Sequence, residues 1–174
     1  TASPVPTNVA ADLARAAGLY YEGDFEQALR LYSDAARAAA GGQRLDALWQ
    51  LAGAAYARGN TAAAERALED LLASHPGAER ERLALLLLGA VRLERGDDAG
   101  ADEALTKYLA TEGPAAAFAS IRLADIAGRQ GDSTGAIRFA NAALAAGLPA
   151  HAEAEARFDP KGVRERLLSR RRKG

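Results

Sequence analysis

The sequence predicts an all-α fold in which short helices pair and then stack as a solenoid. A Gly-Asp or Gly-Asn pair recurs at a spacing of 36, 37 and 35 residues. Periods of about 20 to 50 residues are typical of stacked supersecondary units. Hydrophobic residues reach 49% of the chain while aromatic residues make up only 6%, which suits thin layers of closely packed, alanine-rich helices. The four pairs are Gly23-Asp24, Gly59-Asn60, Gly96-Asp97 and Gly131-Asp132.

Each of these pairs predicts a tight turn between two helices. Glycine accepts the left-handed conformation that ends a helix, and Asp or Asn then caps the next one. Longer junctions contain Gly or Pro, at Gly41-Gly42, His75-Pro76-Gly77, Gly113-Pro114 and Gly147-Leu148-Pro149, and these separate one helix pair from the next. We therefore expect helices at 8–22, 24–39, 43–58, 60–74, 78–95, 97–111, 115–130 and 132–146.

The same breaks divide the chain into three parts. Residues 1–8 are expected to be a flexible leader left after removal of a signal peptide or, equally, a linker between domains. The chain has no Met, so we expect a processed protein or an excised part of a longer one. Residues 9–149 are the predicted repeat domain, with repeats at about 9–42, 43–77, 78–113 and 114–149. Residues 150–174 are predicted to be helical, with a basic tail.

Charge is distributed unevenly along the chain. The formal net charge is -1, but Lys161 to Lys173 holds seven basic residues and one acid, so this end carries +6 and the remainder -7. The tail has three interpretations: a solvated helix, a contact with an acidic protein surface, or a contact with anionic lipid or nucleic acid. No aromatic residue is interleaved among the tail arginines, which disfavours stacking on RNA bases. The tail consists of Arg164, Arg166, Arg170, Arg171, Arg172 and Lys173.

The residues that carry the helix packing resemble those of the tetratricopeptide repeat family, from Ala10 to Pro149. The second pair has Leu48, Leu51-Ala52, Ala55, Ala64, Leu68 and Pro76 at the places where that family has its large and small residues. Ala28, Ala64, Ala101 and Ala136 occupy one place relative to the turn. The resemblance implies a right-handed α-solenoid of about four antiparallel helix pairs with C-terminal capping helices. The period exceeds the family's usual length, and the fourth pair departs most, with Ala140 in place of a large ring.

In that family the first helix of each pair lines a concave groove in which partner segments lie. The resemblance therefore implies a groove here that is apolar and aromatic at one end and carries two arginines at the other. An exposed apolar groove needs a cover, which a partner, the chain's own termini or a second copy of the chain would supply. The implied residues are Leu13, Tyr20, Tyr21, Trp49, Gln50, Tyr56, Leu86, Leu93, Phe118, Ile121, Arg122 and Arg129.

Motifs for catalysis are missing from the sequence. It has no Cys and only two His, His75 and His151, both near junction prolines, whereas a zinc site needs three or four ligands in a fixed geometry. No phosphate-binding loop, dinucleotide fingerprint or nucleophile-elbow serine occurs. We therefore predict no enzyme activity, no cofactor, no metal and no small-molecule substrate.

The sequence thus predicts a protein-interaction module or scaffold that binds an apolar or amphipathic segment of another protein or peptide in the groove. The Ala-, Arg- and Gly-rich composition suggests a bacterial protein of an envelope, pilus or secretion assembly, so a periplasmic or envelope-associated location is favoured over a cytoplasmic one. The alternatives are a helical-repeat binder of nucleic acid, a binder of anionic surfaces through the basic tail, and an oligomerisation domain of a larger protein. Nucleic acid is disfavoured by the -7 body, and membrane contact is expected only through the tail.

Overall fold

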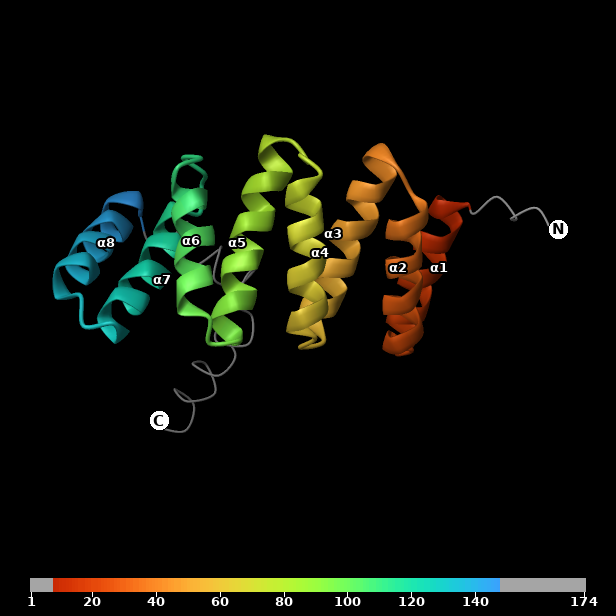
Figure 1. Ribbon diagram of the computed structural model, residues 1–174, viewed down its shortest axis with the longest axis horizontal. Coiled ribbons are helices and arrows are strands. Elements are labelled where there is room, and N and C mark those ends of the chain that lie inside the picture. Colours follow the sequence, from red (N-terminus) through yellow and green to blue (C-terminus); the bar gives the residue numbers. More distant parts are fainter. Residues whose placement is uncertain (1–7, 148–174) are drawn as a thin grey trace. The chain divides into compact units, whose positions relative to one another are not determined.

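The computed structural model describes residues 8–147, and over this range it contains helices and the loops between them (Figure 1). The predicted all-α fold of helix pairs is therefore confirmed, while the handedness of the solenoid and the exact repeat boundaries stay predictions. The expected leader, the capping helices and the basic tail lie outside the described residues. The helices are α1 Val9–Glu22, α2 Phe25–Ala38, α3 Gly41–Ala57, α4 Thr61–Ala73, α5 Ala78–Glu94, α6 Asp98–Leu109, α7 Ala116–Arg129 and α8 Ser133–Ala146.

The four Gly-Asp and Gly-Asn turns share one geometry. The glycines have φ of +92°, +73°, +76° and +78°, in the left-handed region that only glycine adopts without cost. The next residue donates its N–H to the carbonyl five residues earlier, at 2.9 Å in every case, as in Asp24 to Leu19. Its side chain then accepts a hydrogen bond from the N–H three residues further on. Each turn thus closes one helix with a Schellman bond and caps the next.

The chain divides into two compact units, Thr1–Ala84 and Leu85–Gly174. In the first, helices α1 to α4 pack in consecutive order, and α1 also contacts α3. Ala16 and Ala28 are completely buried, and Tyr32 packs with them in one cluster. Small side chains at these places let the two helices of a pair approach closely, as the sequence predicted.

In the second unit, α7 packs against both α6 and α8. Ala101 is completely buried, whereas its counterpart Ala136 is half-buried. On α8, Ile137 is 63% exposed and Leu144 66% exposed. Helix α8 therefore leaves two large apolar side chains in solvent, and it belongs to the pair that departs most from the family pattern.

One predicted break lies two residues earlier than expected. The junction is formed by Ala39 and Ala40 in extended conformation, and α3 begins at Gly41 rather than after Gly42. Gly41 has a left-handed φ of +55°, a conformation that favours glycine, so a glycine still marks this junction. Helix α3 consequently has 17 residues, whereas α1 has 14. Some of the residues by which the repeat exceeds the family's usual length therefore lie within α3.

The loop between α6 and α7 is held by a buried tyrosine. The hydroxyl of Tyr108, a residue only 1% exposed, accepts a hydrogen bond from the N–H of Ala115 at 2.7 Å. A Cβ on Gly113 would lie 2.4 Å from the same hydroxyl oxygen, so only glycine fits there. The left-handed residue of this loop is Glu112, with φ of +52°.

We expect Gly89→Ala to destabilise the protein by about 1–3 kcal/mol, the usual effect of overpacking a core. A Cβ at this position would lie 2.7 Å from Cδ2 of Leu105, so the Leu105 side chain or the two helices must shift. Urea denaturation monitored by circular dichroism measures the change. The matched control is Gly53→Ala, also within a helix but with open space around the new methyl group, which should stabilise the protein by about 0.5–1 kcal/mol. Equal effects of the two substitutions would contradict this packing.

We expect Tyr108→Phe to cost about 1–3 kcal/mol of unfolding free energy, because the buried N–H of Ala115 loses its acceptor. Amide hydrogen exchange at Ala115 should also accelerate, which separates loss of this bond from a general loss of stability. Tyr21→Phe is the control, since Tyr21 is 89% exposed and its hydroxyl remains in water. Unchanged exchange at Ala115 would show that the hydroxyl does not hold the loop.

Candidate partner-binding surface

The aromatic end of the predicted groove lies in the first unit, on α1 and α3. Tyr20 is half-buried, and its ring lies edge-on to Phe25 at a centroid distance of 5.1 Å and to Tyr21 at 6.3 Å. Tyr21 is 89% exposed. Leu13 packs against the same buried cluster as Tyr20. Of the predicted residues on α1, Leu13 and Tyr20 therefore contribute to packing, and Tyr21 faces solvent.

A stack that the sequence did not reveal lies beside Tyr20. The guanidinium of Arg58 lies 3.7 Å from the centroid of the Phe25 ring, so Tyr20, Phe25 and Arg58 link α1, the start of α2 and the end of α3. Such cation–π contacts are favourable where the charge is partly desolvated. Phe25 directly follows the first Gly-Asp turn, Arg58 directly precedes the Gly-Asn turn, and Tyr20 lies three residues before Gly23. This proximity to the turns was the only available signal.

The groove residues that the sequence predicted on α3 share one face of this helix. Trp49 and Tyr56 are half-buried, while Gln50 and Gly53 are exposed. At the start of the same helix, Asp46 pairs with Arg80 at 2.7 Å. The face therefore combines two partly covered aromatic rings with small and polar neighbours. Partly buried aromatic rings of this type are enriched among the residues that dominate binding energy at protein interfaces.

The groove residues predicted in the second unit differ in exposure from those predicted on α3. Leu86 and Phe118 are each 1% exposed, so the prediction that they line an exposed surface is wrong. Both lie in helix stretches in which neighbouring residues are buried as well, 84–91 and 117–120, and in such stretches helical periodicity no longer identifies an outer face. Leu93 and Ile121 are half-buried.

The two predicted arginines are engaged with other residues of the same unit. Arg129 donates two hydrogen bonds to the carboxylate of Asp98, at 2.9 and 2.7 Å. Arg122 lies 5.1 Å from the ring centroid of Phe118 and pairs with Asp125 at 3.7 Å, with 16% of its side chain exposed. Asp98 precedes Arg129 by 31 residues, so no local pattern could reveal the pairing.

Within residues 8–147, no group of three or more His, Asp or Glu side chains is placed to hold a metal ion. No helix in this range has both the length and the apolar character needed to cross a membrane. His75 lies in the loop after α4 with a left-handed φ of +51°. His151 and the basic tail residues Arg164 to Lys173 lie outside the described residues.

A comparison with protein-family models matches residues 46–78 to one described as a tetratricopeptide repeat. The match begins within α3, includes all of α4 and ends at the first residue of α5. It thus supports the family resemblance in the unit that also holds Trp49 and Tyr56. Tetratricopeptide repeats generally mediate contacts between proteins. No curated protein matches the chain.

The pairing of Arg129 with Asp98 predicts a pH dependence. Hydrogen bonds from the Arg129 guanidinium lower the pKa of Asp98 below its ordinary value of 3.8. A carboxyl group whose pKa is depressed by folding adds stability above its unfolded-state pKa, and this stability is lost as pH falls through the folded-state pKa. We expect Arg129→Gln to be less stable than the wild type at neutral pH, and the difference to disappear in acid below the folded-state pKa.

Carboxyl NMR titration measures the pKa of Asp98 directly, and urea denaturation at several pH values measures the stability difference. Arg129→Gln should raise that pKa towards its ordinary value. The control is Arg15→Gln, an exposed arginine on α1, which should leave the pKa of Asp98 unchanged. An Asp98 pKa that is equal in wild type and Arg129→Gln would contradict the pairing.

Proposed function

We propose that the protein is an interaction module that binds an apolar or amphipathic segment of another protein along the outer face of α3. The observation that carries the proposal is the grouping of Trp49 and Tyr56, both half-buried, beside exposed Gln50 and Gly53. The tetratricopeptide match over residues 46–78 supports the same unit. Binding would bury the remaining ring surface, and the polar neighbours would form the rim of the interface.

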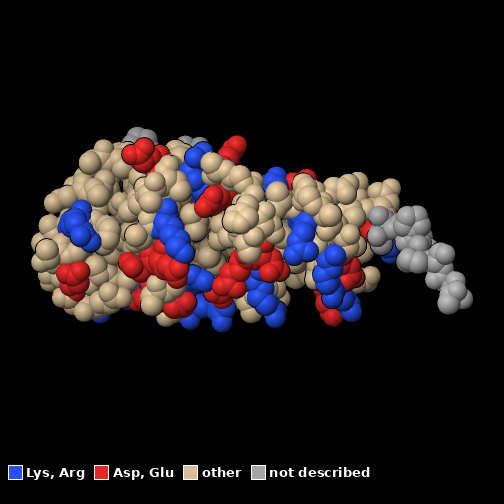
Figure 2. Space-filling model, turned by 45° about the horizontal axis from the view of Figure 1, so that its top comes forward, with Lys and Arg blue, Asp and Glu red and all other residues tan. Residues whose placement is uncertain are grey.

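The charge distribution favours a protein partner over nucleic acid. On the face seen in Figure 2, positive and negative side chains of the described residues lie next to one another. A phosphate-binding surface instead presents clustered Lys and Arg, since its affinity depends on neutralising consecutive phosphates. A bacterial envelope, pilus or secretion assembly remains our proposal for the setting, and it rests on composition alone.

The single tryptophan makes this surface directly measurable. Trp49 is the only Trp in the chain, so labelling this chain with 5-fluorotryptophan gives a single ¹⁹F NMR signal that reports on the α3 face. We expect a partner captured from an extract of the native organism to shift and broaden this Trp49 signal, because binding would bury the exposed part of the ring. Capture without any change at Trp49 would assign binding to another surface.

We expect the double variant Gln50→Arg/Gly53→Arg to abolish capture of that partner, because two long charged side chains then cover the α3 face. Both positions are exposed, and nothing lies within 4 Å of a Cβ at Gly53, so folding should be retained. The matched control is Ala62→Arg/Ala73→Arg, which adds the same charge at exposed positions of α4. Equal capture by both variants would refute the proposed surface. Light scattering on the wild type tests the alternative in which a second copy is the partner.

A further inference from the structure

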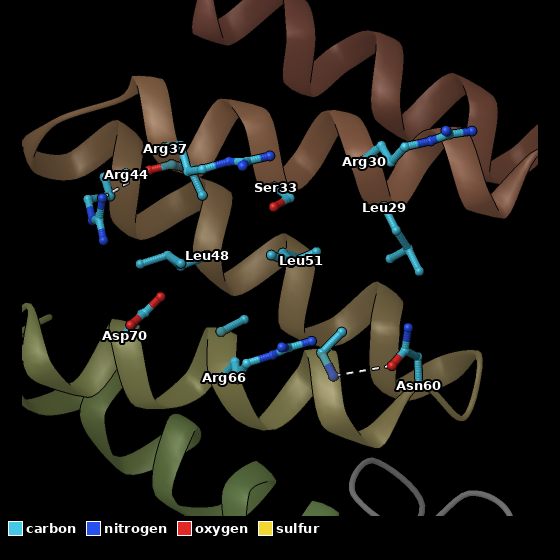
Figure 3. Close-up of a pocket in the computed structure, with 13 residues that line it drawn as sticks. Leu29, Arg30, Ser33, Arg37, Arg44, Leu48, Leu51, Asn60, Arg66 and Asp70 are labelled. Carbon is cyan, nitrogen blue, oxygen red and sulfur yellow. Dashed lines mark hydrogen bonds between the residues drawn. The ribbon is translucent and has the colours of Figure 1, made fainter.

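A second groove lies in the first unit, between α2, α3 and α4 (Figure 3). Its volume is about 490 Å³, and its floor is apolar, with Leu29, Leu48, Leu51 and Ala67 among the lining residues. Leu48 and Leu51 lie on a different side of α3 from Trp49, because each residue rotates a helix by about 100°. This groove is therefore separate from the surface proposed above.

Arginines surround the apolar floor. Arg30 and Arg37 come from α2, Arg44 from α3 and Arg66 from α4, against a single lining carboxylate, Asp70. In Figure 3 the labelled leucines of α3 lie between the arginines of α2 and Arg66. The lining thus combines an apolar contact surface with four guanidinium groups from three helices.

These arginines are held in different ways. Arg44 is half-buried and donates to a backbone carbonyl of α2 at 3.2 Å, which fixes its position. Arg30 and Arg37 pair with Glu26 and Asp34, one turn or less away on the same helix, and these side chains are all at least 65% exposed. Exposed pairs of this type contribute little to stability, so carboxylates of a partner can exchange with them.

The fold does not require a basic groove at this place. Counting from the Gly-Asp and Gly-Asn turns identifies the positions of α6, α7 and α8 that correspond to the four arginines. One of these is an acid, two are alanines and one is basic, and Asp102 stands where the first unit has Leu29. In the order of Arg30, Arg37, Arg44 and Arg66, the corresponding residues are Glu103, Ala110, Ala116 and Arg138.

We propose that the α2–α3–α4 groove binds an acidic, partly apolar segment of a partner protein. Guanidinium groups recognise carboxylates with paired, directional hydrogen bonds, and the leucine floor accepts the apolar side chains between them. Helices α2 and α4, with 14 and 13 residues, give the groove two long walls, which suit a peptide segment. The groove is a second interaction surface that works independently of the α3 face.

Selection from a phage-displayed library of random peptides of about 15 residues, roughly the length of α2, tests this proposal on the full chain. We expect enriched peptides to combine Asp or Glu with apolar residues. Fluorescence anisotropy with a labelled enriched peptide then gives Kd for wild type and for Arg37→Glu/Arg66→Glu. This variant should raise Kd by about tenfold or more, because it places like charges opposite each other.

The matched control is Arg15→Glu/Arg138→Glu, which makes the same change in net charge at exposed positions outside the groove and should leave Kd within about twofold of wild type. Binding should leave the ¹⁹F NMR signal of Trp49 unchanged, which separates this site from the α3 face. Enriched peptides without excess acid, no enrichment, or equal losses in the two variants would overturn the proposal. Displacement of the peptide by single-stranded RNA would reassign the groove to nucleic acid. Sedimentation of a dimer that Arg37→Glu/Arg66→Glu abolishes would reassign it to a second copy of the chain.

Discussion

The structure of each helix pair depends on one constraint, the reversal of the chain within two residues. A left-handed glycine ends the first helix, and the side chain of the next residue starts the second. Because the same 2.9 Å backbone bond recurs in all four turns, the two helices of every pair leave the turn in nearly the same way. The side chains packed between the two helices must then fit the helix separation that the turn sets.

That separation explains the composition. Helices that leave a two-residue turn lie close together, and only small side chains fit where they are nearest. Ala28, Ala64 and Ala101, each four residues after its capping residue, are completely buried. Gly89 represents the extreme, since even a methyl group there would collide with Leu105. Larger buried side chains, Tyr32, Leu68 and Leu105, occupy the positions one turn further along. An alanine-rich chain can therefore build an ordered core with few aromatic residues.

The helices and turns were predictable because their signals are local. Glycine, the capping residue and the alanine four positions later all lie within a short stretch of sequence. The start of α3 was placed two residues too late because a left-handed glycine such as Gly41 can open a helix as well as interrupt one. Leu86 and Phe118 were misplaced because a continuous apolar run does not identify an outer face. The arginine partners, above all Asp98 for Arg129, depend on contacts between neighbouring helix pairs, and sequence spacing carries no information on these.

The sparse burial of α8 has a consequence for how the second unit opens. In a stack of helix pairs each layer is stabilised by its neighbours, and stability is approximately a sum of local terms. The layer of α7 and α8 has the half-buried Ala136, and α8 leaves Ile137 and Leu144 largely in water. Helix α8 buries only Gly135 and Ala143, whereas α6 buries four residues, Leu105 and Tyr108 among them. Thermal fluctuations should therefore detach α8 before α6. Within residues 8–147, unfolding of the second unit should therefore start at α8, because this helix leaves apolar side chains exposed to water.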